Sequence, residues 1–472
     1  MTTATPILSR VERALDALFT AAQAHGGWIP GLLDRESGAM SAEFPPPIAG
    51  VRQSDRVFRG SNFIHDHPTL AVARALGRER EIGRAFAAFG AAAATSPTGL
   101  FPWGEHLFWD FESQTAFNGY VLREMANGPT HDHLTQFPLW AWEKLWQTRP
   151  DVVPRFALAL EAHKRAPREP HEAWEFNRHA DYEIAGPGHH RQERSCDFPR
   201  HCGFFVFDCA FAWSKTGDEK HLENARWWAD YWWTRRDLAS NLCAVESRSP
   251  AHETQFFGVL HAGQTLSLAV SLLESAQIVG DNPFAAQLRH RGQKFAEAFL
   301  RLPHDVSNAK IITKTRQNAD DAAENSPLEG ATFYGTRYGE TSSAGPVGVL
   351  LCALWQITGD ARALELAKAI GARYAREKMP EGVAVPARDA GRALELAALL
   401  AQITGEKQWR QNSLELAAQH LAHFCDFDDN PLPARAPHEP FYESQTGVAF
   451  LLHGLARVAF VAQNNAETLP PD

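Results

Sequence analysis

Hydrophobic residues recur at helical spacing along almost the whole chain, and short turns that combine Gly with an acidic residue interrupt them. The clearest turns are the Thr-Gly-acid triplets at 216–218, 358–360 and 404–406, each between two apolar helical stretches. Gly readily adopts the left-handed backbone conformation that ends one helix, and the acidic residue after it can cap the start of the next helix. Alternating apolar and polar residues, which would indicate strands, are almost absent. The pattern therefore predicts a series of helical hairpins.

Six weakly similar hairpins follow from this pattern. Their paired helical stretches span 70–76 and 79–94, 139–146 and 152–163, 211–215 and 222–233, 266–278 and 284–300, 349–357 and 364–375, and 394–403 and 409–424. Such hairpins, joined by long connections, are typical of an all-α (α/α)6–7 toroid, where inner helices surround a central cleft and outer helices shield them. A stacked solenoid is the alternative, but its turns would recur at a more regular spacing.

The connections between the hairpins are long and carry most of the chemically reactive residues. Pro, Gly, His and charged residues gather at 95–130, 164–203, 237–255, 302–345 and 426–442. We expect residues 61–464 to form one toroid domain that carries the functional site. Residues 1–60 are predicted to be a lead-in helix and loop, and 465–472 a tail.

Composition narrows the class of protein. The net charge of −10 leaves no overall basic field for nucleic acid or anionic lipid, so an anionic ligand would need a local patch. The chain has no run of 18 apolar residues that would predict a membrane span. It also does not open with a basic stretch followed by an apolar run, so we expect a cytoplasmic protein, with a periplasmic one as the alternative if a segment precedes this sequence. The six Cys form no C-x-x-C pair and are expected to be reduced thiols. With 14 Trp and 29 Phe, some aromatic rings are available to stack on sugars.

Three segments place imidazoles, carboxylates and one arginine at intervals that suit loops meeting in one cleft. They are Trp-Gly-Glu-His at 103–106, Thr-His-Asp-His at 130–133 and Asn-Arg-His at 177–179. These side chains are ligands for ions such as Mn²⁺, Ca²⁺, Mg²⁺ or Zn²⁺. Each segment also has an ordinary structural explanation. Asp132 or Thr130 can cap a helix, and Arg178 can pair with Asp181 on a surface loop.

The same segments resemble a known family. Trp103-Gly104-x-His106, then His131-Asp132 leading through Phe137-Pro138 to Trp142-Glu143-x-x-Trp146, then Phe176-Asn177-Arg178-His179-x-x-Tyr182, are similar to helical-toroid pectate lyases of polysaccharide lyase family two and related bacterial uronate lyases. The resemblance covers roughly residues 100–235. It implies that His106, Asp132 and His179 bind a divalent metal ion and that Arg178 acts as the base. The family has Glu where this chain has Asp132, so His131 or His133 is an alternative ligand.

The activity implied by this resemblance is β-elimination on an acidic oligosaccharide or polysaccharide. The C5 hydrogen beside a uronate carboxylate is weakly acidic, and a cation on that carboxylate stabilises the charge that develops when the hydrogen leaves. Mn²⁺ or Ca²⁺ is the expected ion, with Zn²⁺ as the third candidate. Tyr182, His189 and His190 are candidate general acids, and a neutral Tyr182 or His is an alternative base. Sugar-binding side chains are predicted at Trp103, Trp109, His131, His133, Trp174, Asn177, His190, Arg337 and Tyr338.

Other functions remain open on the sequence alone. A glycoside hydrolase on the same toroid, including one that removes unsaturated uronyl ends, would need two carboxylates facing the sugar. Asp110, Glu112, Asp132 and Glu143 are its candidates. A sugar epimerase would use a His pair instead, and a non-catalytic carbohydrate-binding protein would keep the aromatic cleft without the proton chemistry.

Overall fold

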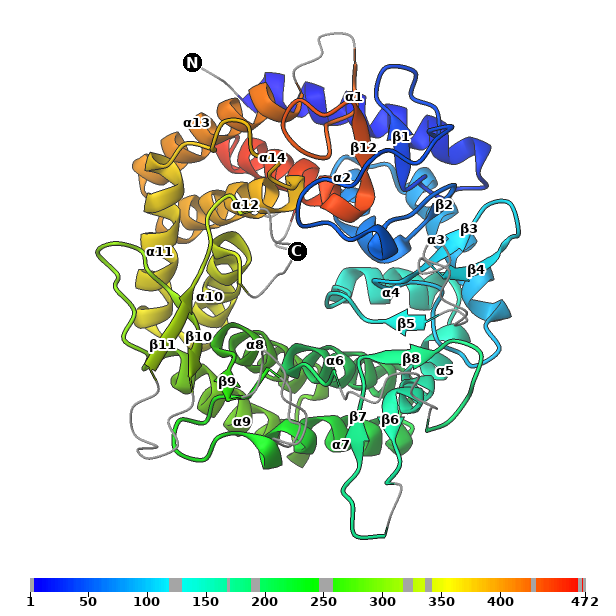
Figure 1. Cartoon of the computed structure of the whole chain (residues 1–472), viewed down its shortest axis with the longest axis vertical. Helices are drawn as coiled ribbons and strands as arrows, with labels where there is room; N and C mark the ends of the chain where they lie inside the picture. The colour runs from blue at the N-terminus through cyan, green and yellow to red at the C-terminus, as the bar shows by residue number, and fades with distance from the viewer. Residues whose placement is uncertain are drawn as a thin grey trace.

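The described helices form a closed ring of helical hairpins (Figure 1). The computed structural model describes residues 4–118, 130–167, 170–187, 196–245, 258–316, 326–335, 342–425, 430–465 and 469. Within these residues, six hairpins follow one another, each an inner helix and then an outer helix. They are α2 (His67–Ala75) and α3 (Glu79–Thr95), α4 (Leu139–Thr148) and α5 (Val152–Ala159), α6 (Pro199–Thr216) and α7 (Glu219–Arg235), α8 (Ala262–Val279) and α9 (Pro283–Leu300), α10 (Ala344–Thr358) and α11 (Ala361–Arg376), and α12 (Ala387–Thr404) and α13 (Lys407–Phe424).

A seventh pair joins the two ends of the chain. The inner helix α14 (Val448–Ala462) packs against α12, against α2 and against α1 (Ala4–Ala24), which is its outer partner. Residues predicted as a lead-in thus supply the outer helix of the last pair. The prediction of an all-α toroid is confirmed. No helix in the described ranges is both long and apolar enough to span a membrane.

Burial follows the position of each helix in the ring. The inner helices α8 and α12 are buried on almost every side, because neighbouring inner helices and their own outer partners enclose them. The outer helix α11 buries only one stripe, which includes Leu366, Ile370 and Tyr374. This explains why the helical periodicity of the outer helices is easier to read in the sequence.

The Thr-Gly-acid turns have the predicted geometry. Gly217, Gly359 and Gly405 end inner helices with positive φ angles of 69°, 72° and 68°, which cost Gly little because it lacks a Cβ. The carboxylates of Asp218 and Asp360 then accept hydrogen bonds from the backbone two residues on, at 3.0 Å each. The capping differs in two hairpins, since the Glu406 side chain after Gly405 makes no cap, and Asn282 caps α9 in place of an acidic residue.

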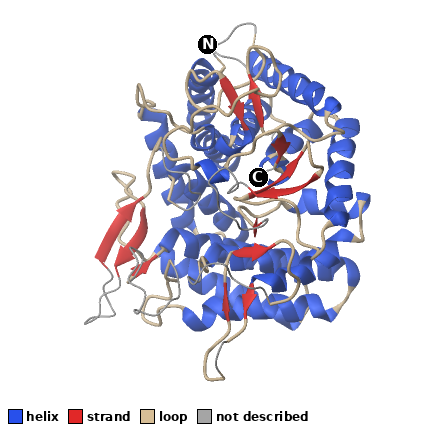
Figure 2. Ribbon diagram, turned by 45° about the vertical axis from the view of Figure 1, so that its right-hand side comes forward, coloured by secondary structure: helices blue, strands red, loops and turns tan. Residues whose placement is uncertain are grey.

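Short strands occupy the connections between helices, where the sequence pattern predicts almost none (Figure 2). Five small sheets form: β1 (Leu32–Asp34) with β12 (Phe441–Glu443); β2 (Gly60–Ser61), β3 (Leu107–Asp110) and β4 (Thr115–Asn118); β5 (Thr130–Asp132) with β8 (His179–Asp181); β6 (Lys164–Arg165) with β7 (Glu175–Phe176); and β9 (Val259–Leu260), β10 (Ile312–Arg316) and β11 (Ser326–Gly330). Single turns of 3₁₀-helix also lie there, at η1 (Gln53–Asp55), η2 (Phe63–His65), η4 (Leu160–His163) and η5 (Ser444–Thr446). Strands of two to five residues are too short for a period-2 pattern to be recognised.

Buried charge reinforces the junction of the chain ends. β1 pairs antiparallel with β12. The carboxylate of Glu443, at the end of β12, contacts Arg56 from the N-terminal region and lies 2.9 Å from Arg435 Nη1. Arg35 Nε donates to the Leu432 carbonyl oxygen at 2.7 Å. These buried groups satisfy one another, as charges removed from water must.

We predict that a methyl group between α12 and α14 weakens the ring. A Cβ on Gly391 would collide with the backbone of Phe450 and Leu451, which cannot rotate away. Gly391→Ala should lower the free energy of unfolding by about 1–3 kcal/mol, measured by denaturant titration. Gly83, inside α3, has no atom within 4 Å of its Cβ position, so Gly83→Ala should be neutral or stabilise by up to about 1 kcal/mol. Equal stability of the two variants would contradict the close packing.

Candidate active site

The pairing of β5 with β8 brings two of the predicted residues together. Asp132 is the cross-strand partner of His179 in this antiparallel pair. Directly opposed residues in such a pair project to the same face, with Cβ atoms about 4.5–5.5 Å apart. Segments 47 positions apart in the sequence therefore present their side chains to one point, and Arg178 precedes β8 beside them.

The loop that carries Glu105 and His106 lies against the same strands. Gly104 has a φ of 141°, and a Cβ there would lie 2.5 Å from the Asp132 carbonyl oxygen. Only Gly allows this approach. Asn62 Nδ2 donates to the Gly104 carbonyl oxygen at 2.6 Å, and His106 forms a β-bridge with Thr130. The loop is thus fixed from both sides.

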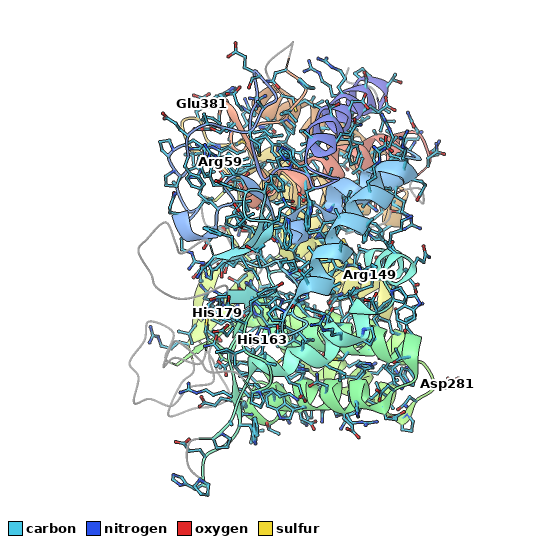
Figure 3. All side chains as sticks on the ribbon, turned by 90° about the vertical axis from the view of Figure 1, so that its right-hand side faces the viewer. Arg59, Arg149, His163, His179, Asp281 and Glu381 are labelled. Carbon is cyan, nitrogen blue, oxygen red and sulfur yellow. The ribbon has the colours of Figure 1, made fainter. Side chains whose placement is uncertain are left out.

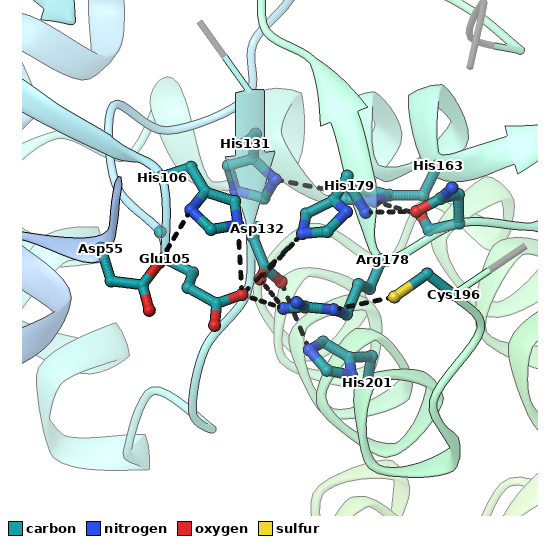
Figure 4. A network of polar contacts seen from close by, with 12 residues as sticks. Asp55, Glu105, His106, His131, Asp132, His163, Arg178, His179, Cys196 and His201 are labelled. Atoms are coloured by element: carbon teal, nitrogen blue, oxygen red, sulfur yellow. Dashed lines mark hydrogen bonds and ion pairs between the residues drawn. The ribbon is translucent and has the colours of Figure 1, made fainter. Parts of the chain in front are cut away.

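Arg178 lies between two carboxylates at the centre of the site (Figure 4). Its Nη1 contacts Asp132 Oδ2 and lies 2.5 Å from Glu105 Oε2, while its Nε donates to Cys196 Sγ at 3.2 Å. The side chains of Arg178, Asp132 and Glu105 are 7%, 0% and 8% exposed. Burial alone would lower the pKa of Arg178, but the charges of Asp132 and then Glu105 outweigh it and raise that pKa well above its usual value.

The charge of Arg178 also sets the ionisation of its neighbours. Burial alone would raise the pKa of Glu105, but Arg178 outweighs it and lowers that pKa well below its usual range. Burial, together with repulsion from Arg178, lowers the pKa of His179 to about 3. At neutral pH Glu105 is therefore a carboxylate and His179 a neutral imidazole. These are the protonation states that a metal ion requires of its ligands.

Three side chains converge as a metal site would require. One ligand atom each from Glu105, His106 and His179 lies within 4.8 Å of the others. Glu105 Oε2 is 3.4 Å from His106 Nε2 and 3.8 Å from His179 Nε2. Among the described residues, neither ring nitrogen of His179 has a partner that meets hydrogen-bond geometry, although the side chain is largely buried. Two imidazoles and a carboxylate form a donor set for Mn²⁺ or Zn²⁺, so the residues present fit a divalent ion.

A carboxylate behind His106 orients its ring. His106 Nδ1 lies 3.1 Å from Asp55 Oδ1, which leaves Nε2 on the side of Glu105. Carboxylates commonly orient metal-binding imidazoles in this way. The structure thus adds Glu105 as a candidate ligand and Asp55 as the group that orients His106. Asp132 is also close, because its Oδ2 lies 3.8 Å from His179 Nε2, but it pairs primarily with Arg178.

A chain of imidazoles supports the strands from behind. His131 Nδ1 lies 2.9 Å from His163 Nε2, and His163 Nδ1 lies 2.9 Å from the Asn177 carbonyl oxygen. A carbonyl only accepts, so His163 donates through Nδ1 and accepts the Nδ1–H of His131. Asn177 Oδ1 in turn accepts from the His179 backbone N–H at 2.9 Å. These bonds hold the segment on which Arg178 and His179 lie.

Several residues predicted to bind sugar are buried instead. His131 and His133 are fully buried, and Asn177 is nearly so, with its side chain fixing the backbone. Trp103 is fully buried and stacks on Phe89 in the core. Trp109 is buried and stacks on Trp28. In these five residues, apolar packing and backbone bonds occupy the surfaces that a sugar would need, so the predicted sugar contacts lack an accessible surface.

The remaining predicted residues have different outcomes. Tyr182 is buried, and burial raises the pKa of its hydroxyl, which makes it a weaker acid. Trp174, on the β6–β7 hairpin, is 41% exposed, and its role in sugar stacking stays a prediction. His189, His190, Arg337 and Tyr338 lie outside the described residues.

The carboxylates proposed for a hydrolase do not form a facing pair. Asp110 Oδ2 accepts from the Ser113 backbone in the turn after β3, and Glu143 pairs with Lys215 at 2.6 Å. Glu112 is exposed beyond β3. Asp132 and Glu105 are close together, but Arg178 lies between them and keeps Glu105 ionised.

Sequence reasoning missed Arg52, Asp55, His163 and His201. His201, near the start of α6, places Nε2 3.3 Å from Asp132 Oδ1, and burial lowers its pKa well below the usual value. The sequence signal for these four residues was weak, because each is a single polar residue among many others in its part of the chain. Figure 3 shows His163 and His179 near each other in the folded chain.

A separate cavity lies among α4, α6, α8, α10 and α12. Its volume is about 740 Å³, and Phe204, Phe207 and Glu274 are among its lining residues. It shares no lining residue with the cluster of Glu105, His106, Arg178 and His179.

We predict that the cation site depends on Glu105 and His179 and, more weakly, on Asp55. Glu105→Gln and His179→Ala should each lower Mn²⁺ affinity by at least about 100-fold, and Asp55→Asn by about 10- to 100-fold, measured by isothermal titration calorimetry. The exposed His171 provides the control, since His171→Ala should bind as the parent does. A larger loss in Asp132→Asn than in Glu105→Gln would favour the ligand set implied by the sequence resemblance.

Comparison with known proteins identifies no family. No known family matches the sequence, and no curated protein matches it. Similar solved structures include an unsaturated glucuronyl hydrolase specific for heparin, with 10% identity, 85% of this chain and 99% of that chain covered, and a TM-score of 0.47. A family 76 α-mannanase from Bacteroides thetaiotaomicron has 11% identity over 69% and 84% of the two chains, with a TM-score of 0.43. An unsaturated glucuronyl hydrolase from Bacillus sp. GL1 has 13% identity over 55% and 74%, with a TM-score of 0.40. These three proteins are glycoside hydrolases on helical folds, and their similarity to this chain is too low to assign it to their families.

Proposed function

We propose that this protein cleaves uronic-acid-containing glycans by metal-assisted β-elimination, which leaves a 4,5-unsaturated sugar. The observation that supports this is the convergence of Glu105, His106 and His179 beside the guanidinium of Arg178. A uronate offers a carboxylate that a cation and a guanidinium can hold, and an acidic hydrogen on the neighbouring carbon. In this site, a bound cation and Arg178 can hold the carboxylate, and Arg178 is the candidate base for the acidic hydrogen.

The cation would be held by Glu105, His106 and His179, with Asp55 orienting His106. When bound, a divalent ion would supply positive charge that stabilises the enolate form of the sugar acid and favours the neutral form of a nearby guanidine. Asp132 fixes the position of Arg178 through their direct contact, and His201 lies against the other oxygen of Asp132. The site is thus organised before substrate arrives.

Arg178 is the proposed base, and its two carboxylate partners define what that role demands. The two carboxylates raise the pKa of Arg178 and so keep its guanidinium protonated. Arg178 can therefore accept the C5 proton only when the negative charge of the carboxylates is offset and the neutral guanidine can form. Otherwise Arg178 remains a cation and counters the charge that develops on the substrate carboxylate. His201, a neutral imidazole, is then the alternative base. In either role Arg178 is essential to the chemical step.

The alternative of a glycoside hydrolase rests on weaker ground in this site. It requires one carboxylic acid that stays protonated near neutral pH. Glu105 has a lowered pKa because of Arg178, and Asp132 lies in direct contact with the same guanidinium. Glu105 thus lacks the surroundings that keep a catalytic carboxylic acid protonated.

We predict that Arg178→Ala strongly lowers turnover while substrate binding persists. Pectate, alginate and glucuronan, each with Mn²⁺ or Ca²⁺, would be assayed for the ultraviolet absorbance of the unsaturated product. The parent should produce it from at least one polymer, and Arg178→Ala should lower kcat by about 10²- to 10⁴-fold. Arg301, whose side chain is 75% exposed on α9's C-terminal side, provides the control Arg301→Ala.

Two results would contradict the proposal. One is the absence of new absorbance from every polymer with either ion. The other is the release of reducing ends without unsaturation, which would indicate hydrolysis instead of elimination.

A further inference from the structure

Arg52 is a half-exposed cation at the edge of the candidate site. It directly precedes η1, and its side chain is 50% exposed. Its Nε donates to Asp55 Oδ2 at 2.8 Å, and its Nη2 contacts Glu105. Asp55 orients His106, so Arg52 contacts two of the carboxylates around the cation site.

Glu105 is shared by two guanidiniums that differ in access to solvent. Arg178 lies on its buried side and is enclosed by Asp132, Cys196 and the ring of Phe198. Arg52 lies on its open side. Among the described residues, partners of Arg52 are found at Nε and Nη2, and a guanidinium has five N–H donors in a planar fork. Arg52 therefore retains donors on a face that a ligand can reach.

An anionic ligand needs a solvent-accessible cationic side chain at this position. The chain carries a net charge of −10, and Asp55, Glu105 and Asp132 lie together at the site. The approach of a second negative charge would be unfavourable without a compensating cation. Arg178 is already in contact with two carboxylates, whereas half of the Arg52 side chain faces solvent. A bidentate contact with a planar carboxylate is the interaction that guanidinium geometry fits best.

We propose that Arg52 is a specificity-determining residue that binds the carboxylate of the uronate next to the reacting sugar. This inference rests on the proposed function for its ligand class. It deepens that function, because it selects runs of consecutive uronates over glycans with isolated ones. It also assigns a binding role to the N-terminal region, upstream of the segments that carry the sequence resemblance.

The test is binding, not turnover. Saturated trisaccharides of galacturonate, mannuronate and glucuronate, and their carboxyl-reduced neutral counterparts, would be titrated into the whole protein with Mn²⁺ by calorimetry. The variants are Arg52→Gln, Arg52→Lys and the control Arg59→Gln. Arg59 is an exposed arginine in the same loop region whose Nη2 donates to the Ala42 carbonyl oxygen (Figure 3).

The parent should bind at least one acidic trisaccharide more tightly than its neutral counterpart. Arg52→Gln should weaken acidic binding about tenfold or more, which corresponds to one charge-assisted contact, and leave neutral binding unchanged. Arg52→Lys should keep part of the affinity because it keeps the charge without the fork. Arg59→Gln should bind as the parent does.

Three results would overturn the inference. They are unchanged acidic binding in Arg52→Gln, no binding of any acidic trisaccharide by the parent, and an equal loss of Mn²⁺ affinity, which would indicate that Arg52 only supports Glu105. The proposed function fails separately. Binding that depends on Arg52 without an unsaturated product would contradict the lyase activity and support this binding site. Full turnover in Arg52→Gln would support the lyase activity and contradict this binding site.

Discussion

A buried guanidinium held between two carboxylates organises the functional part of this protein. Arg178, Glu105 and Asp132 come from three separate segments of two connections between helices, and all are nearly inaccessible to water. A charge in such a position is costly unless it is paired, and loss of one partner leaves the others uncompensated. The pairing therefore fixes how the three segments meet. His106 and His179, each adjacent in sequence to a member of this group, are positioned by the same constraint.

The ring of helices and the connections have different tasks. The inner helices are enclosed on nearly all sides and form a rigid frame, while the polar chemistry lies on short strands and turns at its edge. Functional residues on loops need such a frame, because small displacements are costly for binding and catalysis. Here the frame extends into the loops through the paired strands β5 and β8 and through the hydrogen bonds of His163.

The helical pairs could be predicted from the sequence because each is encoded locally, by apolar spacing and by turns such as Thr216-Gly217-Asp218. The meeting of Asp132, Arg178 and His179 was expected from a resemblance, and strand register explains it. Arg52 and Asp55 could not be found in this way, because their contacts depend on how a distant loop packs. The buried state of Trp103 and His131 was also invisible, since the same residue types line sugar clefts and cores.

The closure of the ring has a consequence for how the chain reaches its folded state. The outer partner of α14 is α1, and β1 pairs with β12, so elements that lie far apart in the sequence must find each other. Contacts of such sequence separation carry a large entropic cost and slow folding. Until α14 has formed, the apolar stripe of α1, with Val11 and Leu15, lacks that partner. Apolar surface exposed in this way during folding favours aggregation.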